Sequence, residues 1–274
     1  MEIGYVCTNF NNSAFTRGAV RTLLASEGCE YRIFVVDNAS NEQNVDELRR
    51  LKEEFPSVTL LLRKDNVGYF RGLNAGIREM RRLHPTLAWA IIGNNDLEFP
   101  LDFSEKLLRN APRLEKHMVI SPDVITVDGH HQNPHVISAI STVREIFYDL
   151  YYANYHLGML IQKVAGMLPS ISKRSDETHW QEARPIYQGH GSVYLLTPRF
   201  FERFEELWAP TFLMSEEYFL SKQLSDVGTQ VYYDPCLQIV HHWHASLAKL
   251  PSKQRWIFAR DAHREYRKYV KVFG

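Results

Sequence analysis

Residues 31–40 of the chain read YRIFVVDNAS, and this stretch decides the fold class. An apolar run ends at Asp37, three turn-forming residues follow it, and a charged helical pattern then covers residues 44–55. A short apolar strand followed by a helix is the repeating unit of a parallel sheet. At the carboxyl end of its strand, Asp37 is suited either to accept hydrogen bonds from a ligand or to cap the following helix.

The same alternation extends to both sides of this stretch. We expect strands at residues 3–7, 58–62 and 89–92, and helices at residues 15–26 and 69–83. This pattern predicts an α/β fold with a mostly parallel central sheet flanked by helices. In such sheets ligands bind beyond the carboxyl ends of the strands. Polar residues gather at these ends, at positions 8–9, 37–38, 65–66 and 94–96.

The second half of the chain is less regular. Residues 143–168 are rich in Tyr, Leu and Ile, which predicts one or two helices, whereas residues 171–184 are polar and are expected to form a loop. From Pro185 a strand–helix–strand pattern returns, and the chain ends in a charged helix over residues 254–270. We therefore expect an α/β half (1–125), a helical and loop insertion (126–184) and a second half that ends in the C-terminal helix (185–274).

Composition excludes some classes of function. The 32 Lys and Arg residues balance the 32 Asp and Glu residues, whereas a nucleic-acid-binding protein would show a basic excess. Cys7, Cys29 and Cys236 are widely spaced and form no zinc-ligand pattern, which indicates a reducing environment. The sequence shows no signal peptide and no apolar run of membrane-spanning length. We expect a cytoplasmic location, with contact to the inner face of a membrane left open.

Residues 66–76, NVGYFRGLNAG, combine a strand end with the start of a helix. Gly68 precedes this helix, and Gly72 and Gly76 lie one turn apart within it. Glycines let a ligand approach the backbone, and the N-terminus of a helix favours phosphate. The alternative is close packing of the helix on the sheet, which we expect for Gly76.

Three polar residues, Asn94, Asn95 and Asp96, follow the most apolar of the expected strands. Burying such side chains costs free energy unless they face a ligand or solvent. Asp96 can give one oxygen to Mg²⁺ or Mn²⁺, and the phosphates of a substrate usually complete the coordination of these ions. The alternative is a surface turn before Pro100.

Two further groups of titratable residues lie in the second half. Glu216 and Glu217 precede a helical pattern over residues 218–225, so they belong to its first turn, where acids also occur because they stabilise the helix dipole. His241, His242 and His244 follow a β-rich run. Strand alternation puts His241 on one face and the other two on the opposite face. Histidines so close in sequence fit either a metal site or structural roles.

These motifs occur in the order found in family 2 glycosyltransferases, and the chain most resembles the subgroup of bacterial rhamnosyltransferase-like enzymes. The segments that carry the resemblance are residues 35–40, 66–74, 94–98, 189–192, 214–220 and 241–246. The resemblance implies a GT-A fold, a nucleotide diphosphate sugar as the sugar donor, and a divalent metal ion, Mn²⁺ or Mg²⁺. It does not extend to residues 126–184, which are expected to lie on the acceptor side or to form an oligomer contact.

The resemblance also implies roles for individual residues. Thr8 and Asn9 would lie near the nucleotide base and Asp37 would contact it. Asp96 would hold the metal, and Asn95 would contact the ribose or a phosphate. The expected contacts to the sugar nucleotide are Thr8, Asn9, Asp37, Asn66, Gly68, Asn74, Asn95 and Gly191.

In the second half, Gly191 would line the site of the donor sugar, and His241 would meet the metal or the diphosphate. The catalytic base of the family lies in an acidic pair, which Glu216 and Glu217 match, and Glu217 is the preferred candidate. The family usually carries another acid two residues later, where this chain has Phe219. This departure leaves open which glutamate is the base.

The predicted function is transfer of a sugar, with inversion, to a hydroxyl group of a saccharide or lipid-linked saccharide, in the synthesis of a bacterial surface polysaccharide or glycolipid. One alternative is a nucleotidyltransferase that makes the sugar nucleotide. Such enzymes usually carry a basic, Gly-rich N-terminal loop, but residues 9–16 contain no basic residue. The other alternative, favoured by Phe219, is a nucleotide-sugar-binding protein without turnover.

The aromatic stretch of the insertion raises a separate question about contacts with other molecules. Tyr151, Tyr152 and Tyr155, with Leu157 and Leu160, fit a lipid surface near a lipid-linked acceptor. They also fit an acceptor-side lid packed on the core, or a contact in a homodimer, and we prefer the packed arrangement.

Overall fold

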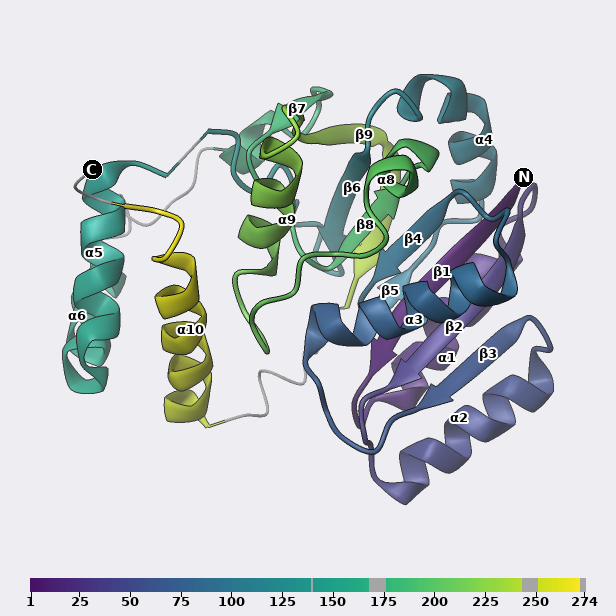
Figure 1. Cartoon of the computed structure of the whole chain (residues 1–274), viewed down its shortest axis with the longest axis horizontal. Helices are drawn as coiled ribbons and strands as arrows, with labels where there is room; N and C mark the ends of the chain where they lie inside the picture. The colour runs from purple at the N-terminus through teal and green to yellow at the C-terminus, as the bar shows by residue number, and fades with distance from the viewer. Residues whose placement is uncertain (139, 168–175, 243–250, 272–274) are drawn as a thin grey trace.

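The computed structural model describes residues 1–138, 140–167, 176–242 and 251–271. Within these residues nine strands form one sheet, and helices cover both of its faces (Figure 1). No helix in these ranges combines the length and the apolar character needed to cross a bilayer.

The first half of the sheet is parallel, in the strand order β3-β2-β1-β4. Its strands are β1 (Glu2–Asn9), β2 (Glu30–Asp37), β3 (Val58–Leu62) and β4 (Ala90–Gly93). The connecting helices are α1 (Ser13–Ala25), α2 (Glu42–Glu54) and α3 (Tyr69–Leu83). These elements confirm the predicted alternation, and the predicted boundaries of β3 and α3 are those observed.

The second half of the sheet is mixed. The antiparallel strand β8 (Val193–Leu196) lies between β4 and β6 (Val119–Thr126), and β6 pairs in parallel with β9 (Val231–His241). The short strands β5 (Leu97–Glu98) and β7 (Arg184–Ile186) both run antiparallel to β9. The expectation of a mostly parallel sheet is therefore confirmed for the first half and for the pair β6–β9, whereas β5, β7 and β8 run antiparallel to their neighbours. These directions were not predicted, because a short and fully buried run such as β8 carries no signal of strand direction.

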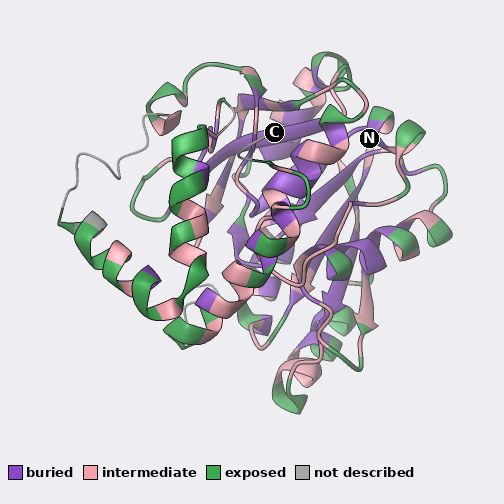
Figure 2. Cartoon of the chain, turned by 60° about the vertical axis from the view of Figure 1, so that its left-hand side comes forward, coloured by how far each residue is buried: buried purple, intermediate pink, exposed green. Residues whose placement is uncertain are grey.

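Two apolar clusters cover the opposite faces of the sheet (Figure 2). The helices α1, α2 and α4 (Phe103–Leu114) pack on one face, and α3, α8 (Pro198–Arg203) and α9 (Glu216–Ser225) pack on the other. A Cβ atom at Gly76 would lie 2.3 Å from Cγ1 of Val6 and 3.0 Å from Cγ2 of Val36. Gly76 therefore allows α3 to approach β1 and β2 closely, which confirms the packing role expected for it.

The insertion forms a helical hairpin at one side of the molecule. Its helices are α5 (Thr142–Ala153) and α6 (Tyr155–Gly166), which confirms the prediction of one or two helices. A 3₁₀ turn, Asp176–His179, lies within the segment predicted to be a loop. The hairpin packs against α10 (Ser252–Tyr266), and the three helices stand apart from the parallel half of the sheet (Figure 1).

Candidate active site

A cleft of about 520 Å³ opens at the carboxyl ends of the parallel strands and is lined by residues from both halves of the chain. It brings together ten of the twelve residues that the sequence predicts to be functional. These are Thr8, Asn9, Asn66, Gly68, Asn95, Asp96, Gly191, Glu216, Glu217 and His241. The two others, Asp37 and Asn74, do not line the cleft.

Asp37 lies behind the cleft and holds a residue that lines it. Its Oδ1 accepts a hydrogen bond from Nδ2 of Asn9 (2.8 Å), and its Oδ2 accepts one from the backbone N–H of Ser40 (2.9 Å). The carboxylate is almost fully buried. Asp37 therefore does not line the cleft, and its expected contact with a nucleotide base stays a prediction. Asp37 instead fixes Asn9 and the turn after β2.

Asn74 also has an internal role. Its Nδ2 donates to the carbonyl oxygen of Leu207 (2.7 Å), and its Oδ1 accepts from the N–H of the same residue (2.9 Å). Both ends of the amide are thus used within the protein, on a side of α3 that faces away from the cleft. These hydrogen bonds connect α3 to the chain before α9, and the expected contact between Asn74 and the sugar nucleotide stays a prediction.

Gly68 joins the two halves of the cleft at the start of α3. Its backbone angles, φ 89° and ψ −175°, lie in a region that is essentially restricted to glycine. A Cβ atom there would come within 1.9 Å of the carbonyl oxygen of Phe212. That oxygen accepts the N–H of Tyr69 (3.1 Å), and the hydroxyl of Tyr69 donates to the carbonyl oxygen of Gly191 (2.9 Å). Any other residue type at position 68 would displace the carbonyl group of Phe212 and the hydrogen bond that it accepts from Tyr69.

Asn95 is locked by hydrogen bonds to the first helix and strand. Its Nδ2 lies within hydrogen-bond distance of Oδ1 of Asn9 (3.1 Å), Oγ1 of Thr16 (2.8 Å) and the carbonyl oxygen of Asn12 (3.1 Å). Because its amino group is engaged inside the protein, Asn95 holds the loop after β4 in place and thereby fixes the position of Asp96.

Asp96 and His241 face each other at the base of the cleft. Nε2 of His241 lies 3.3 Å from Oδ1 of Asp96, and both side chains are nearly fully buried. Nδ1 of His241 lies 2.8 Å from Oε1 of Gln132. Because a carbonyl oxygen can only accept, Nδ1 carries a proton, and Nε2, which lies 3.2 Å from Nδ2 of Asn94, is the nitrogen that faces Asp96.

This arrangement fits a cation. Oδ1 of Asp96 is buried without a hydrogen-bond partner among the described residues, and Nε2 of His241, which it faces, would give its lone pair to the same cation when the ring is neutral. Burial by itself would raise the pKa of Asp96, but interactions with His241, its own backbone N–H and Asn94 hold that pKa below its usual range, so the carboxylate is ionised at neutral pH. A carboxylate oxygen and an imidazole nitrogen suit Mn²⁺, and carboxylate oxygens suit Mg²⁺.

The described residues contain no group of three or more His, Cys, Asp or Glu side chains placed to hold a metal. The two ligands would therefore leave most coordination positions to water and to oxygens of a bound substrate. Nε2 of His242 points elsewhere, to Oε2 of Glu98 at 2.9 Å. This difference confirms that His241 and His242 lie on opposite faces of the strand. His244 and Ser246 lie outside the described residues.

Glu216 and Glu217 occupy the first turn of α9, as predicted. The two residues before the helix, Met214 and Ser215, have positive φ angles of 75° and 63°, which is strained backbone for residues other than glycine. Burial, and then the charge of Glu217, raises the pKa of Glu216 to about 8. Glu216 is therefore protonated at neutral pH.

The carboxylate of Glu217 lies against the backbone of Gly191. A Cβ atom at Gly191 would come within 2.4 Å of Oε1 of Glu217, so a larger residue at position 191 would displace this carboxylate. By contrast, Phe219 is fully buried and packs edge-on against Trp208, with ring centroids 5.1 Å apart. The residue that replaces the family's second acid thus belongs to an apolar cluster and does not reach the cleft.

Several cleft residues were not singled out from the sequence, among them His190 and Phe258. His190 lines the cleft, with Nδ1 2.9 Å from Oγ of Ser192 and its ring centroid 5.6 Å from that of His241. The glycines on either side of His190 are the sequence feature that could have pointed to it. Phe258 of α10 also lines the cleft and contacts Phe212, with ring centroids 5.3 Å apart. It gave no signal, because α10 reads as a solvated surface helix.

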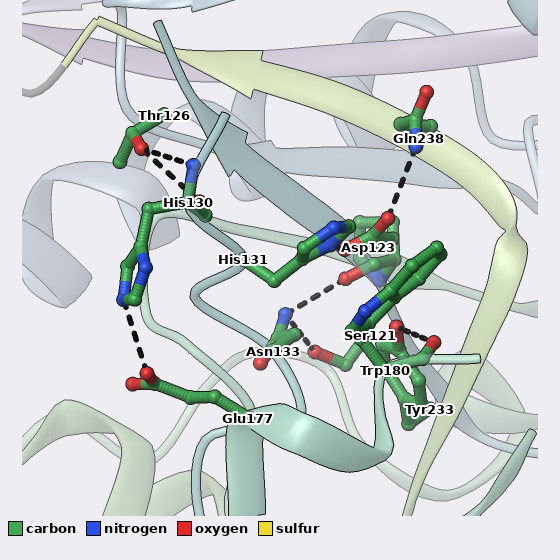
Figure 3. Close-up of polar contacts among 11 residues, drawn as sticks. Ser121, Asp123, Thr126, His130, His131, Asn133, Glu177, Trp180, Tyr233 and Gln238 are labelled. Carbon is green, nitrogen blue, oxygen red and sulfur yellow. Dashed lines mark hydrogen bonds and ion pairs between the residues drawn. The ribbon is translucent and has the colours of Figure 1, made fainter. Parts of the chain in front are cut away.

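Gln132, which holds His241, was also missed, and its neighbours anchor it to the sheet (Figure 3). Nδ1 of His131 lies 2.8 Å from Oδ1 of Asp123, and the ring of His131 stacks on Trp180 with centroids 4.0 Å apart. Nδ2 of Asn133 donates to Oγ of Ser121 (2.9 Å) and to the carbonyl oxygen of Pro122 (2.7 Å). The residues on both sides of Gln132 are thus fixed, which fixes the direction of its amide.

The chain is similar in sequence to a known protein family and in structure to known proteins. The model of the family described as "Glycosyl transferase family 2" matches residues 6–175, which is more than half of the chain. A search of curated proteins found no significant match.

The solved structures that are similar to the chain include two complexes with Mn²⁺. One is the mannosyltransferase PcManGT from Pyrobaculum calidifontis in complex with GDP-Man and Mn²⁺, with a TM-score of 0.55 and 14% identity over 90% of this chain and 59% of that chain. The other is GalNAc-T7 with UDP, GalNAc and Mn²⁺, with a TM-score of 0.55 and 13% identity over 90% of this chain and 44% of that chain. These likenesses show the fold, which is the predicted GT-A fold. The chain spans only about half the length of these two proteins.

Proposed function

Because the chain belongs to glycosyl transferase family 2, we propose that it transfers a sugar from a nucleotide diphosphate sugar to an acceptor hydroxyl with inversion at the anomeric carbon. The observation that carries this proposal is the shared cleft, in which the facing acceptors of Asp96 and His241 lie together with the acidic pair at the start of α9. The resemblance to rhamnosyltransferase-like enzymes supports a saccharide or lipid-linked saccharide acceptor, in bacterial surface polysaccharide or glycolipid synthesis. The three free cysteines support a reducing, cytoplasmic compartment.

In this proposal the sugar nucleotide occupies the cleft between Thr8, Asn9, Asn66 and Gly68 on one side and Gly191 on the other. Asp96 and His241 hold a divalent ion, Mn²⁺ or Mg²⁺, which would neutralise charge on the departing diphosphate. Both similar solved structures contain Mn²⁺ and a nucleotide, which supports this assignment. Asp37 and Asn95 act by holding Asn9 and Asp96 in position.

Glu217 is the proposed base. The acceptor oxygen forms a bond to the anomeric carbon, the bond from that carbon to the diphosphate oxygen breaks, and the proton of the acceptor passes to Glu217. A single displacement of this kind inverts the anomeric centre. Burial and the charge of Glu217 raise the pKa of Glu216, which makes Glu216 the second candidate for the base, and its protonated form would lower the negative charge next to Glu217.

The test is a thermal-shift panel of nucleoside diphosphates with and without Mn²⁺, followed by an assay for nucleotide release from the matching sugar nucleotide. We expect one base to give a stabilisation that requires Mn²⁺ and is lost in Asp96→Asn. Release of the nucleoside diphosphate with an acceptor, and its loss in Glu217→Gln, would exclude the binding protein without turnover. Release of pyrophosphate from a nucleoside triphosphate would instead identify a nucleotidyltransferase, and stabilisation by none of the nucleotides would refute the proposal.

A further inference from the structure

The α5–α6 hairpin carries apolar side chains on its solvent side. On α5 these residues recur at positions i, i+4 and i+7, and on α6 at i, i+3 and i+7, so each helix has an apolar stripe. The residues of the apolar stripe are Val143, Phe147 and Leu150 on α5 and Leu157, Leu160 and Val164 on α6. All six are exposed, Val143 to 78% and Leu160 to 58%. An amphipathic helix in a folded domain normally turns this face inward, so a contiguous exposed apolar surface indicates an interaction site.

The tyrosines of the hairpin face the opposite way. The ring centroid of Tyr152 lies 4.7 Å from that of His263, and the ring of Tyr155 lies 5.5 Å from Trp256, so both pack on α10. Nε1 of Trp256 donates to the carbonyl oxygen of Tyr151 (3.3 Å). The tyrosines thus attach the hairpin to α10, as the packed alternative expected, and leave the apolar stripe free on the outside.

The charged residues of the hairpin are also divided between its two sides, with the acids towards α10 and the cations towards solvent. Its two acids face α10: Glu145 accepts a hydrogen bond from the hydroxyl of Tyr266, and Asp149 pairs with His263 (2.8 Å) and Arg267 (2.8 Å). Its two cations, Arg144 and Lys163, are exposed. The outward surface of the hairpin is therefore apolar and cationic.

The neighbouring helix adds to this charge. Residues 142–167 and 251–271 contain nine Lys and Arg against four Asp and Glu, whereas the whole chain is neutral. Exposed cations on or directly after α10 include Lys253, Arg255, Arg264 and Lys268. The rest of the chain carries the balancing negative charge, so the basic residues are concentrated on this three-helix unit.

We propose that the apolar stripe and the surrounding cations dock the protein on an anionic lipid surface. Apolar side chains would enter the boundary between headgroups and acyl chains, and Lys and Arg would contact the anionic headgroups. Charge complementarity favours lipid over a second copy of the chain, because pairing two such faces would bring Arg144 and Lys163 of one copy towards cations of the other. The docking does not depend on sugar transfer. Phe258 on α10 lines the cleft, so the three-helix unit that carries the docked face borders the cleft.

The test is flotation of the full chain with vesicles of phosphatidylcholine alone and with phosphatidylglycerol added. We expect binding to the anionic vesicles only, weakened by high salt. The double variant Leu150→Glu/Leu160→Glu should reduce the bound fraction at least tenfold, and Lys163→Glu should reduce it severalfold. Leu101→Glu is the control, because Leu101 is an even more exposed leucine (75%) outside the three-helix unit and its substitution should leave binding unchanged.

Circular dichroism and thermal unfolding of each variant would verify that it is folded. Absence of flotation, or flotation that the double variant does not reduce, would overturn the proposal. A dimer in solution that the double variant dissociates, without vesicle binding by the wild type, would assign the face to a second copy and would also overturn it. Because these measurements involve no substrate, their outcome is separate from that of the transfer assay.

Discussion

Oε1 of Gln132 lies 2.8 Å from Nδ1 of His241, and both side chains are almost completely buried. This contact links the beginning of the insertion to the end of β9. It fixes the ring of His241 with the lone pair of Nε2 directed at Asp96. A histidine that ligates a metal through one nitrogen usually donates a hydrogen bond from the other, which sets its tautomer and its orientation.

Replacing Gln132 with Leu should therefore weaken the binding of Mn²⁺ by roughly 10- to 100-fold, since the ring of His241 would lose the acceptor that orients it. Electron paramagnetic resonance of free Mn²⁺ during a titration would measure this affinity. Gln132→Glu is the control, because it keeps an acceptor at the same position and should retain the affinity or raise it. Equal affinities for the wild type and Gln132→Leu would show that His241 needs no support from Gln132.

The two neighbouring glutamates should respond differently to the same substitution. Glu217→Gln removes the proposed base and should lower kcat by about 10²- to 10⁴-fold. Glu216→Gln should keep kcat within a few-fold at pH 7, because a neutral amide resembles the protonated carboxyl that burial favours there. Transfer assays at saturating substrate would compare them. The reverse pattern would assign the base to Glu216.

The raised pKa of Glu216 should also make the stability of the protein depend on pH. In the folded state this carboxyl keeps its proton up to about pH 8, whereas its ordinary value is 4.5. Between these values the folded state holds the extra proton, so the stabilisation present below pH 4.5 is lost as the pH rises towards 8. The melting temperature of the wild type should fall relative to that of Glu216→Gln across this window, by roughly 5 °C.

Titrating groups outside the Glu216–Glu217 pair are the same in both proteins, so the difference between the two melting curves reports the titration of this pair. Thermal unfolding in metal-free buffers from pH 4.5 to 8 would measure it. Parallel curves would mean that Glu216 ionises in the folded protein as it does in the unfolded chain.

Gly68→Ala should destabilise the protein by roughly 3 kcal/mol or more, because an L-residue is strained at this backbone conformation and its Cβ atom would collide with the carbonyl oxygen of Phe212. Gly129→Ala is the matched control. Gly129 also has a positive φ, of 82°, but no atom lies within 4 Å of its Cβ position, so its cost should be about 1 kcal/mol. Denaturant unfolding would compare the two variants, and equal losses would contradict the role given to the contact with Phe212.

Much of the cleft could be predicted from local sequence. Short apolar runs that end in polar residues located the carboxyl ends of β1 and β4, and with them Asn9 and Asp96. Such runs fix where a strand ends because the apolar side chains must be buried, and parallel strands place their carboxyl ends at one edge. The acidic pair at 216–217 was placed correctly at a helix start for a similar reason, since the helical period begins directly after it.

The hydrogen-bond partners of the individual polar side chains could not be predicted from local sequence. The pattern put Asp37 at a strand end but could not show that Asn9 and Ser40 occupy its oxygens. Gln132 belongs to an irregular segment with no periodicity, and its partner His241 is distant in sequence. Such contacts depend on how separate segments pack against each other, which local propensity does not encode.

The anchored ends of the insertion have a consequence for protein engineering. His131 and Trp180 stack on each other beside the sheet, so the chain leaves and returns at one point. A segment whose ends already meet can be exchanged for one of another length at little entropic cost. Hybrids with related enzymes should therefore keep residues 130–135 and 176–184 and replace what lies between. A junction at residue 126 would remove Gln132 and leave His241 without the acceptor that orients its ring.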